Sequence, residues 1–445
     1  MTLQLSLHPQ GRGIVLLTAV ALLGTYWIAE TVRIALVETW SESSDPKDVE
    51  RARALDQNNP ELSYRTGTLY LLGVGGDSAD PLPWLRKATE LNPKRGKYWL
   101  GLERACFVAG DQGCADHALA RAMKLSPMTP STEWEAASYY VLTGRWDDSF
   151  AYFRWLLHFD PDRESEIFRL TSRAFDPSTT WQKVIAILPD TRVKCDYLAF
   201  LSENGQFDIA REHWAQTAAL SPAPSFEDVK SYLQDLLRAQ RYGEAANLWR
   251  DLLRLGTIGQ TDGDDKNNLV FNGSFERPVL NAGFDWHPVP AGFVAVDFSD
   301  HTAHTGKYAL RVDYTVPQNG EGEAAYELIP VAPNQKYVLT AYSRSHDLTS
   351  NSGPRLRVQD AKCPECLDVT TDTTVGTTPW HQLKLSFSTG PKAEVLRLSV
   401  WRSRGRTFPM DISGRFWLDS VSLTAAGSSM PGGIGDANVA ASNLP

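Results

Sequence analysis

The chain has 445 residues, of which 42% are hydrophobic and 22% are charged, and its formal net charge is -9. This length exceeds what a single hydrophobic core usually supports, and the composition is that of folded protein, which excludes a wholly disordered chain. The negative charge argues against nucleic acid as a partner, because phosphate binding requires a concentrated basic surface.

The first predicted element is an apolar helix. Gly13–Ala29 carries no charged residue and is just long enough to span a bilayer. The aromatic pair Tyr26–Trp27 lies near its end. Such residues are typical of a membrane interface, whereas a signal-peptide cleavage site requires small residues. We therefore expect a cytoplasmic segment at 1–12 and a single transmembrane anchor at 13–30 in the inner or plasma membrane. Because Arg12 precedes the span, the remaining chain should lie on the periplasmic or extracellular side. A cleaved signal peptide and a buried helix are the alternatives.

Residues 44–256 are predicted to form a helical repeat domain. Proline follows a helical segment six times, at intervals of 33, 34, 34, 28 and 33 residues, and a last unit closes at Gly256. A fixed period of this size is typical of a stacked array of helical hairpins. In the last unit Ser225 and Asp228 form a capping-box pattern, followed by apolar residues at helical spacing. The six prolines are Pro60, Pro93, Pro127, Pro161, Pro189 and Pro222.

These units resemble tetratricopeptide repeats. The turn Gly144–Asp148 and the closing pair Asp160–Pro161 are similar to the pattern of that family, and Gly110 and Gly205 stay in phase with them. The unit from Glu164 to Pro189 is shorter and lacks the turn glycine, so we expect it to be degenerate. The resemblance implies stacked antiparallel helices with a concave surface that docks a partner protein.

Four of the five cysteines are predicted to form disulfides. Cys106 falls near the end of one predicted helix and Cys114 near the start of its antiparallel partner, while Cys363 and Cys366 share a predicted loop. Both pairs suit an oxidising compartment. Free thiols are the alternative for both pairs, and a metal site is a further alternative for Cys363 and Cys366, although no matching second pair of soft ligands is present.

A polar, glycine-rich linker at 257–266 separates the helices from a region of short alternating runs at 267–425. Each run is bounded by Gly, Pro, Asn or Asp, which predicts an antiparallel β-sandwich. The tail at 426–445 is of low complexity, and we expect it to be disordered. The predicted strands are Tyr308–Tyr314, Lys336–Tyr342, Arg355–Val358, His381–Phe387, Val395–Trp401 and Phe416–Leu423.

The region 267–425 also resembles the carbohydrate-binding modules of families 4 and 9. Asn268–Glu276 is similar to their opening segment, His304–Val312 to their second landmark, and Phe416–Leu423 to their closing strand, all in the same order. The resemblance implies a jelly roll of the galactose-binding-like kind that binds a polysaccharide. It also implies a structural calcium ion held by Glu276 and Asp419, through hard carboxylate oxygens. The alternative is that both carboxylates only accept hydrogen bonds from loop amides.

Sugar binding requires aromatic rings for stacking and polar groups for the hydroxyls. Alternation allows Tyr342 and Trp401 to share one face of a sheet. Core packing is the alternative for each ring, and the run Arg402–Arg406 could instead be a solvated loop or bind an acidic polysaccharide. The candidate site residues are Trp286, Tyr342, Trp380 and Trp401, with Arg402, Arg404 and Arg406 as donors.

The sequence contains no phosphate-binding glycine loop, zinc-protease helix or nucleophile elbow. We therefore expect a non-catalytic, membrane-anchored adaptor of the cell envelope that acts in the assembly or export of a surface exopolysaccharide. Its protein partner would be an integral-membrane polysaccharide polymerase or transporter. One alternative is a structural scaffold whose sandwich no longer binds sugar. Another is an enzyme, since the paired carboxylates of a glycosidase need not be neighbours in the chain.

Overall fold

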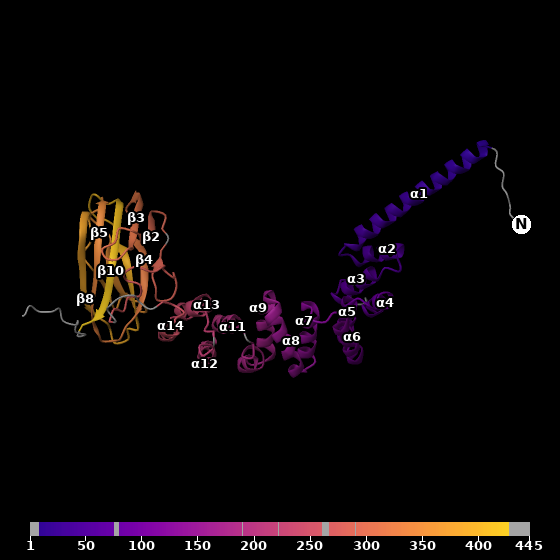
Figure 1. Ribbon diagram of the computed structural model, residues 1–445, viewed down its shortest axis with the longest axis horizontal. Helices are drawn as coiled ribbons and strands as arrows, with labels where there is room; N and C mark the ends of the chain where they lie inside the picture. The colour runs from indigo at the N-terminus through magenta and orange to yellow at the C-terminus, as the bar shows by residue number, and fades with distance from the viewer. Residues whose placement is uncertain are drawn as a thin grey trace, which may run out of the picture. The chain divides into compact units, whose positions relative to one another are not determined.

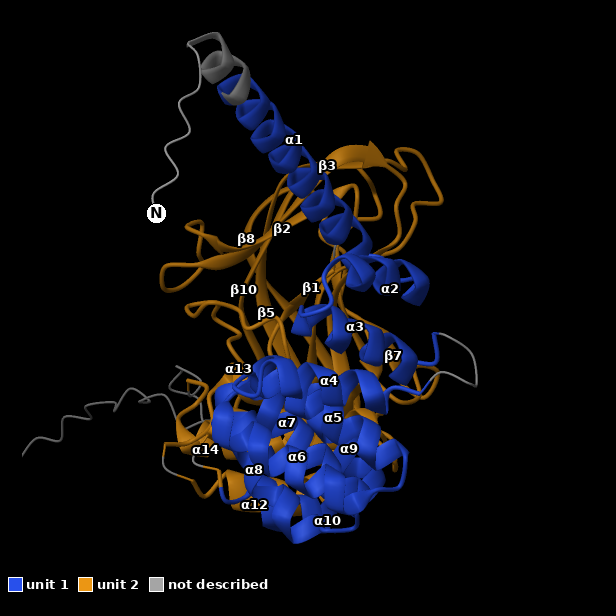
Figure 2. Cartoon of the chain, turned by 90° about the vertical axis from the view of Figure 1, so that its right-hand side faces the viewer, with its two compact units in different colours: residues 1–187 blue, residues 188–445 orange. Residues whose placement is uncertain are grey.

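The computed structural model describes residues 9–74, 80–188, 190–220, 222–259, 267–289 and 291–426. The chain divides into two compact units, Met1–Ile187 and Leu188–Pro445, shown in different colours in Figure 2. Parts of three predicted segments lie outside the described residues: 1–8 of the cytoplasmic segment, 260–266 of the linker and 427–445 of the tail.

The first unit begins with helix α1, Pro9–Ser41 (Figure 1). The stretch Leu16–Ser41 is long and apolar enough to cross a membrane, and its hydrophobic side chains are exposed rather than packed in a core. An apolar N-terminal helix is therefore confirmed. A signal sequence has the same properties, so the choice between anchor and signal, and the side of the membrane, stay predictions.

Short helices follow α1, and consecutive ones pack in pairs. Gly110 and Gly144 end helices in the left-handed conformation, as the turns between paired helices require. Asn59 caps the helix that starts at Pro60, so this proline begins a helix instead of following one. The helices are α2 (Pro46–Leu55), α3 (Pro60–Leu71), α4 (Leu82–Leu91), α5 (Gly96–Val108), α6 (Gln112–Leu125), α7 (Pro130–Leu142) and α8 (Trp146–Phe159).

The unit expected to be degenerate differs from the others in structure as well. A 3-10 turn, Pro161–Arg163, leads into α9 (Glu164–Ala174), and α10 (Pro177–Thr180) continues as a π-helix over Trp181–Ile185. The division between the two compact units falls directly after it, between Ile187 and Leu188. The break in the period therefore coincides with a break in packing.

The second unit opens with four helices: α11 (Thr191–Glu203), α12 (Phe207–Thr217), α13 (Phe226–Arg238) and α14 (Tyr242–Leu255). The capping box of Ser225 and Asp228 is present at the start of α13, as predicted. Trp249 of α14 packs against Phe271 and Phe284, with ring centroids 5.2 and 5.8 Å apart. The hairpin α13–α14 therefore packs against the segment that leads into the sandwich.

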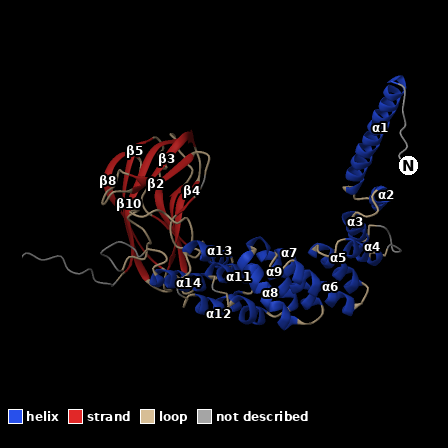
Figure 3. Ribbon diagram, turned by 45° about the vertical axis from the view of Figure 1, so that its right-hand side comes forward, coloured by secondary structure: helices blue, strands red, loops and turns tan. Residues whose placement is uncertain are grey.

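Among the described residues, ten antiparallel strands form two five-stranded sheets (Figure 3). Sheet 1 has the order β1-β4-β9-β6-β7 and sheet 2 the order β2-β3-β10-β5-β8. All six predicted strands are present, and β2 and β4 are additional long strands. The bounds are β1 (His287–Pro288), β2 (Val294–Asp300), β3 (Ala309–Gln318), β4 (Gly322–Pro330), β5 (Lys336–Leu348), β6 (Arg355–Asp360), β7 (Asp368–Thr370), β8 (Gly376–Ser388), β9 (Val395–Arg402) and β10 (Ile412–Ala425).

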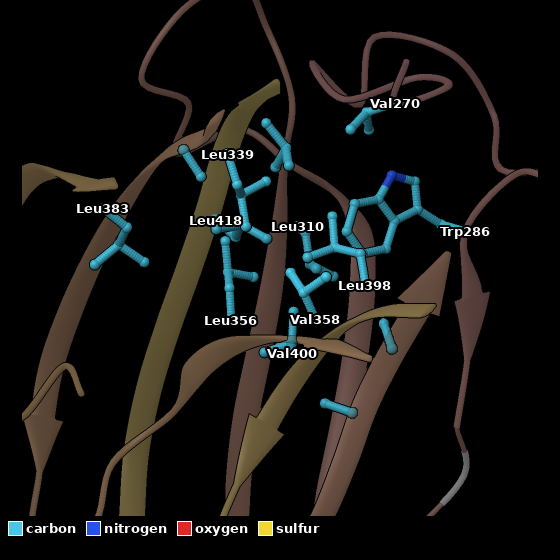
Figure 4. Close-up of a cluster of buried hydrophobic side chains, with 14 of the residues drawn as sticks. Val270, Trp286, Leu310, Leu339, Leu356, Val358, Leu383, Leu398, Val400 and Leu418 are labelled. Carbon is cyan, nitrogen blue, oxygen red and sulfur yellow. The ribbon is translucent and has the colours of Figure 1, made fainter. Parts of the chain in front are cut away.

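The core lies between the two sheets and takes alternate side chains of most of their strands (Figure 4). Trp286 is fully buried in it, beside residues such as Leu310 and Leu398. Leu398 and Val400 of β9 point into this core, so Arg397, Ser399 and Trp401 point outward. The alternation of buried and partly exposed residues in β9 therefore shows which of its side chains lie on the outer face of sheet 1.

Both predicted disulfides are present in the described ranges. Cys106 and Cys114 join α5 to α6 with their Cα atoms 5.7 Å apart, and Cys363 and Cys366 close the β6–β7 loop with a Cα separation of 5.3 Å. Cys195 is a buried free thiol. Glu365 lies close to Cys363 and Cys366, and these three could hold a metal ion if the disulfide were reduced.

Candidate functional site

Three adjacent strands of sheet 1, β4, β9 and β6, place aromatic and charged side chains in rows on the outer face. Register pairs Trp401 with Glu323 on one side and with Arg355 on the other. The next rows along the strands pair Tyr326 with Ser399 and Arg357, and Leu328 with Arg397 and Gln359. We call this surface the sheet-1 face.

The Tyr326 ring is held between two other groups on the sheet-1 face. His287 of β1 stacks on it with a centroid distance of 4.7 Å and an interplanar angle of 6°, and the Arg397 guanidinium lies 3.5 Å from its centroid. Burial lowers the pKa of His287, so the imidazole stacks as a neutral ring at neutral pH. Arg397 also bonds Glu323 at 2.8 Å, which fixes the orientation of both side chains.

Trp401 is partly buried and lies under the guanidinium of Arg357, which is 4.4 Å from the ring. Arg357 in turn donates two hydrogen bonds to Asp368 of β7, at 2.7 and 2.5 Å. This pairing lowers the pKa of Asp368 and raises the pKa of Arg357. Both rings of the sheet-1 face are thus held in place by arginines that are themselves paired.

A pocket of about 360 Å³ lies at the Trp401 end of the face. Three loops form it: the β3–β4 hairpin, the β5–β6 loop and the β9–β10 loop. We call it the loop pocket. Its wall is polar, with hydroxyl, amide and charged groups of the kind that bond sugar hydroxyls. It is lined by Glu321, Asn351, Ser352, Ser403, Arg404, Gly405, Arg406 and Thr407.

Arg402 holds the three loops together from beneath. It is 2% exposed and donates to the carbonyls of Ser352 (2.8 Å), Met410 (2.8 Å) and Gly320, and to the Ser350 hydroxyl (3.2 Å). Each loop supplies at least one acceptor. Burial lowers the pKa of Arg402, but four hydrogen bonds satisfy the guanidinium. The expectation that Arg402 contacts a ligand is therefore wrong, because the side chain is buried and its hydrogen bonds go to the loop carbonyls and the Ser350 hydroxyl.

A second pocket, of about 390 Å³, lies at the opposite end of the sheet-1 face, where the helical hairpin α13–α14 approaches β4. Tyr326, Arg397 and His287 line it from the sandwich, and Tyr242 and Arg238 line it from the helices. Lys362 lies 5.6 Å from the Tyr242 ring. We call it the hairpin pocket. The sheet-1 face therefore runs from one pocket to another.

The predicted site residues do not form one cluster. Trp401 and Arg404, with Arg406, meet at the loop-pocket end of sheet 1. Trp286 is 0% exposed, so no ring face is open to a ligand, and its expected role in sugar stacking is wrong. It packs in the core because β-sandwiches place large apolar rings between their sheets.

Tyr342 and Trp380 lie on the outer face of sheet 2, in β5 and β8. Tyr342 and Trp401 therefore do not share a face, because β5 and β9 belong to different sheets. His304 covers Tyr342 with a ring-centroid distance of 3.7 Å, and Trp380 meets the edge of the same imidazole at 5.6 Å. This cluster is closed on itself, whereas the sheet-1 face borders two pockets.

Glu276 and Asp419 accept hydrogen bonds chiefly from backbone amides of the β2–β3 loop. Asp419 is buried and bonds the amides of His304, Thr305 and Ser420, while Glu276 bonds those of Lys307 and Tyr308. Burial raises the pKa of Asp419. Donor N–H groups occupy both oxygens of Asp419 and one of Glu276. This geometry matches the alternative to calcium, and calcium binding by these two residues stays a prediction.

Sequence reasoning missed several residues of the sheet-1 face, chiefly Glu323, Tyr326, Arg357 and Arg397. The alternation Leu396 to Trp401 contained a signal for Arg397, since it places that residue on the same face as Trp401. Phe408, in the β9–β10 loop next to the loop pocket, was also missed. It is 89% exposed.

Residues 267–405 match the family model of a carbohydrate binding domain. This match supports a C-terminal carbohydrate-binding β-sandwich. The matched segment includes β1 to β9 and the whole sheet-1 face. No curated protein matches the chain.

Similar solved structures each cover part of the chain. One titled "CBM4 structure and function" is 15% identical, covers 35% of this chain and 99% of its own, and has a TM-score of 0.27. The CBM22-1 xylan-binding domain from Paenibacillus barcinonensis Xyn10C is 18% identical over 35% of this chain and 94% of its own, with a TM-score of 0.24. MamA protein is 15% identical over 48% of this chain and 94% of its own, with a TM-score of 0.27.

Proposed function

We propose that the protein is a membrane-anchored, non-catalytic adaptor that binds a polysaccharide along the sheet-1 face and docks a protein partner through its helices. One observation carries the sugar-binding part. Trp401 is held by Arg357 on a face that runs from the polar loop pocket to the hairpin pocket, within the segment that matches a carbohydrate binding domain.

The dimensions of the face suit a chain rather than a single sugar. From Gly322 to Leu328 the strand advances about 20 Å at roughly 3.3 Å per residue. Along this length the face offers the Trp401 ring together with guanidinium, carboxylate and hydroxyl groups. Polysaccharides present the complementary pattern, with C–H faces and hydroxyls repeating along the chain.

The pairing of the carboxylates on this face supports a non-catalytic role. Glu323 bonds Arg397 at 2.8 Å, Asp368 bonds Arg357, and Glu321 lies 3.8 Å from Arg404. A glycosidase requires one carboxylic acid with a raised pKa, whereas the pKa of Asp368 is lowered by its arginine. Paired carboxylates instead orient donors for binding.

The helices and α1 support the remaining parts of the proposal. We assign the helices that follow α1 to the tetratricopeptide type, whose stacked hairpins dock proteins, and α1 to a single membrane span with the soluble units on the periplasmic or extracellular side. A suitable partner is an integral-membrane polymerase or transporter of an exopolysaccharide, because it would supply the polymer close to the anchor. The competing proposal is a scaffold whose sandwich binds no sugar.

Affinity electrophoresis of the full chain in detergent, against a panel of neutral and acidic polysaccharides, tests sugar binding. We expect retention that Trp401→Ala abolishes and Trp380→Ala leaves unchanged, because only Trp401 lies on the sheet-1 face. If retention were lost with Trp380→Ala and not with Trp401→Ala, the binding site would be on sheet 2. No retention by any polymer would favour the scaffold.

The anchor is tested separately, on the protein recovered from membranes. We expect it to resist extraction at alkaline pH and to retain its N-terminal residues on sequencing. A mature N-terminus near residue 30 would instead identify residues 1–29 as a signal peptide. In-membrane crosslinking followed by mass spectrometry should then identify a polytopic partner, and its absence would contradict docking.

A further inference from the structure

Arginines outnumber carboxylates on the sheet-1 face and in the loop pocket. Within the described ranges, five arginines there face three carboxylates, although the whole chain carries a net charge of -9. Arg402 is not counted, because it is buried and bonded to the loops beneath the pocket. The arginines are Arg355, Arg357, Arg397, Arg404 and Arg406, and the carboxylates are Glu321, Glu323 and Asp368.

Two of these arginines have no partner within the part of the chain that the structure describes. Arg357 and Arg397 are paired, and Arg404 is 3.8 Å from Glu321, but neither Arg355 nor Arg406 forms an ion pair there. The Nε of Arg355 is also buried without any hydrogen-bond acceptor. A buried donor without an acceptor is costly, and such groups in folded proteins usually have an explanation.

The position of Arg355 suggests what its acceptor is. It is the register partner of Trp401, so the two residues lie side by side on adjacent strands of the sheet-1 face. Arg404 and Arg406 line the adjacent loop pocket, together with the Ser352 hydroxyl and the Asn351 amide. A ring, a guanidinium fork and hydroxyl-bonding groups together match an acidic sugar, whose carboxylate accepts two parallel N–H bonds.

We propose that the loop-pocket end of the sheet-1 face is a subsite for the carboxylate of a uronic acid, and that the polysaccharide bound by this protein is a polyuronate. This rests on the proposed function and narrows its ligand class. The sugar ring stacks near Trp401, its carboxylate accepts from Arg355, and the neighbouring acidic residue of the polymer is held by Arg406.

Affinity electrophoresis of the full chain in detergent can separate charge from sugar recognition by comparing three polymers. These are polygalacturonate, the same polymer with its carboxyls methyl-esterified, and dextran sulfate. We expect polygalacturonate to bind at least about tenfold more tightly than its ester, because hydrogen bonds to charged groups are lost on esterification. Arg355→Gln and Arg406→Gln should each weaken retention about tenfold.

Arg344→Gln is the matched control. Arg344 lies over Trp417 on the outer face of sheet 2, so the substitution removes the same charge beside a tryptophan on the other sheet. It should leave retention unchanged. Equal weakening by Arg344→Gln would show general electrostatic attraction and overturn the subsite. Arg406 is exposed, so its substitution tests the subsite even if Arg355→Gln disturbs folding.

The remaining outcomes distinguish the subsite from the function. Equal retention by the acid and the ester, with loss on Trp401→Ala, would overturn the polyuronate inference and leave polysaccharide binding intact. Stronger retention by dextran sulfate than by polygalacturonate would show that the subsite binds a sulfate group and would overturn the proposed carboxylate ligand. No retention by these or by neutral polymers would overturn both.

Discussion

Replacing Arg402 by methionine should destabilise the sandwich and abolish polysaccharide binding, although the residue touches no ligand. The substitution leaves the Ser352, Gly320 and Met410 carbonyls and the Ser350 hydroxyl without their shared donor. Each hydrogen bond to a charged group contributes about 1.5–3 kcal/mol, but these share one cation that is costly to bury. We therefore expect a net loss of about 3–5 kcal/mol in the free energy of unfolding.

Scanning calorimetry of the full chain measures this loss as a shift in the Tm of the unit that contains the sandwich. For a unit of this size the shift should be roughly 10 °C. Affinity electrophoresis well below that Tm should show lost retention, because the three loops of the loop pocket are no longer held together. Arg404→Met is the matched control: its side chain is 71% exposed, so Tm should change little while retention weakens.

Two results would refute this reasoning. A Tm shift below about 2 °C for Arg402→Met would show that the buried guanidinium does not hold the loops. The expected Tm shift with unchanged retention would show that the loops do not form the binding site.

Three further predictions concern buried carboxyls, metal and redox state. Burial raises the pKa of Glu327 well above its usual value, and Asp285 adds to this effect. The unfolded carboxyl therefore loses its proton at lower pH than the folded one, so stability falls as pH rises between the two pKa values. Glu327→Gln should be more stable than the wild type at pH 7.5 and no more stable near pH 4, as urea unfolding will show; equal stability at both would contradict it. A calcium chelator should leave Tm unchanged, because amides already occupy oxygens of Glu276 and Asp419, and a drop of several degrees would instead show bound calcium. Reduction of the Cys106–Cys114 disulfide should lower the free energy of unfolding by about 2–3 kcal/mol, because the disulfide closes a short loop and so restricts the unfolded chain. Unfolding with and without dithiothreitol measures this difference.

Much of the fold was predictable because local signals agreed with one another. Gly110, Gly144 and Gly205 all adopt the left-handed conformation at helix ends, where the spacing of the prolines placed the turns. Short alternating runs predicted strands because alternation reflects the burial of one face. The capping box at Ser225 was visible for the same reason, since it is made by residues three apart.

Strand β4 was not predicted, so its residues at the centre of the site, Glu323 and Tyr326, were not predicted either. Its register shifts between Glu323 and Ala325, so two consecutive alanines are buried and alternation fails. The strand also carries Glu327, a charged residue that is fully buried. Sequence pattern assigns such a residue to the surface, which inverts the apparent faces of the strand. The positions of Glu323 and Tyr326 therefore required the structure.

The residues around Arg402 show a second limit of sequence reasoning. Trp401, Arg402 and Arg404 look equivalent as ligand candidates in the chain, but the strand ends at Arg402. Alternation directs Trp401 outward and Arg402 inward. At the end of the strand the core is followed by loops, and Arg402 donates hydrogen bonds to their buried carbonyls. The three loops are distant in the sequence and meet only in the folded structure. The sequence therefore cannot show that Arg402 positions the pocket and does not bind the ligand.

Arg311 on the outer face of sheet 2 and Arg355 on that of sheet 1 differ in how completely their donors are satisfied, and this difference favours sheet 1 as the face that binds an acidic ligand. On sheet 2, Arg311 bonds Asp297, Asp300 and Asp313, and the Trp417 indole donates to Asp300 at 3.0 Å. Groups satisfied by one another gain little from a ligand, since binding would exchange existing bonds for new ones. On sheet 1 the Nε of Arg355 is buried without an acceptor among the described residues. An acidic ligand beside Arg355 would pair a guanidinium that has no ion-pair partner among the described residues, whereas a ligand beside Arg311 would compete with three aspartates.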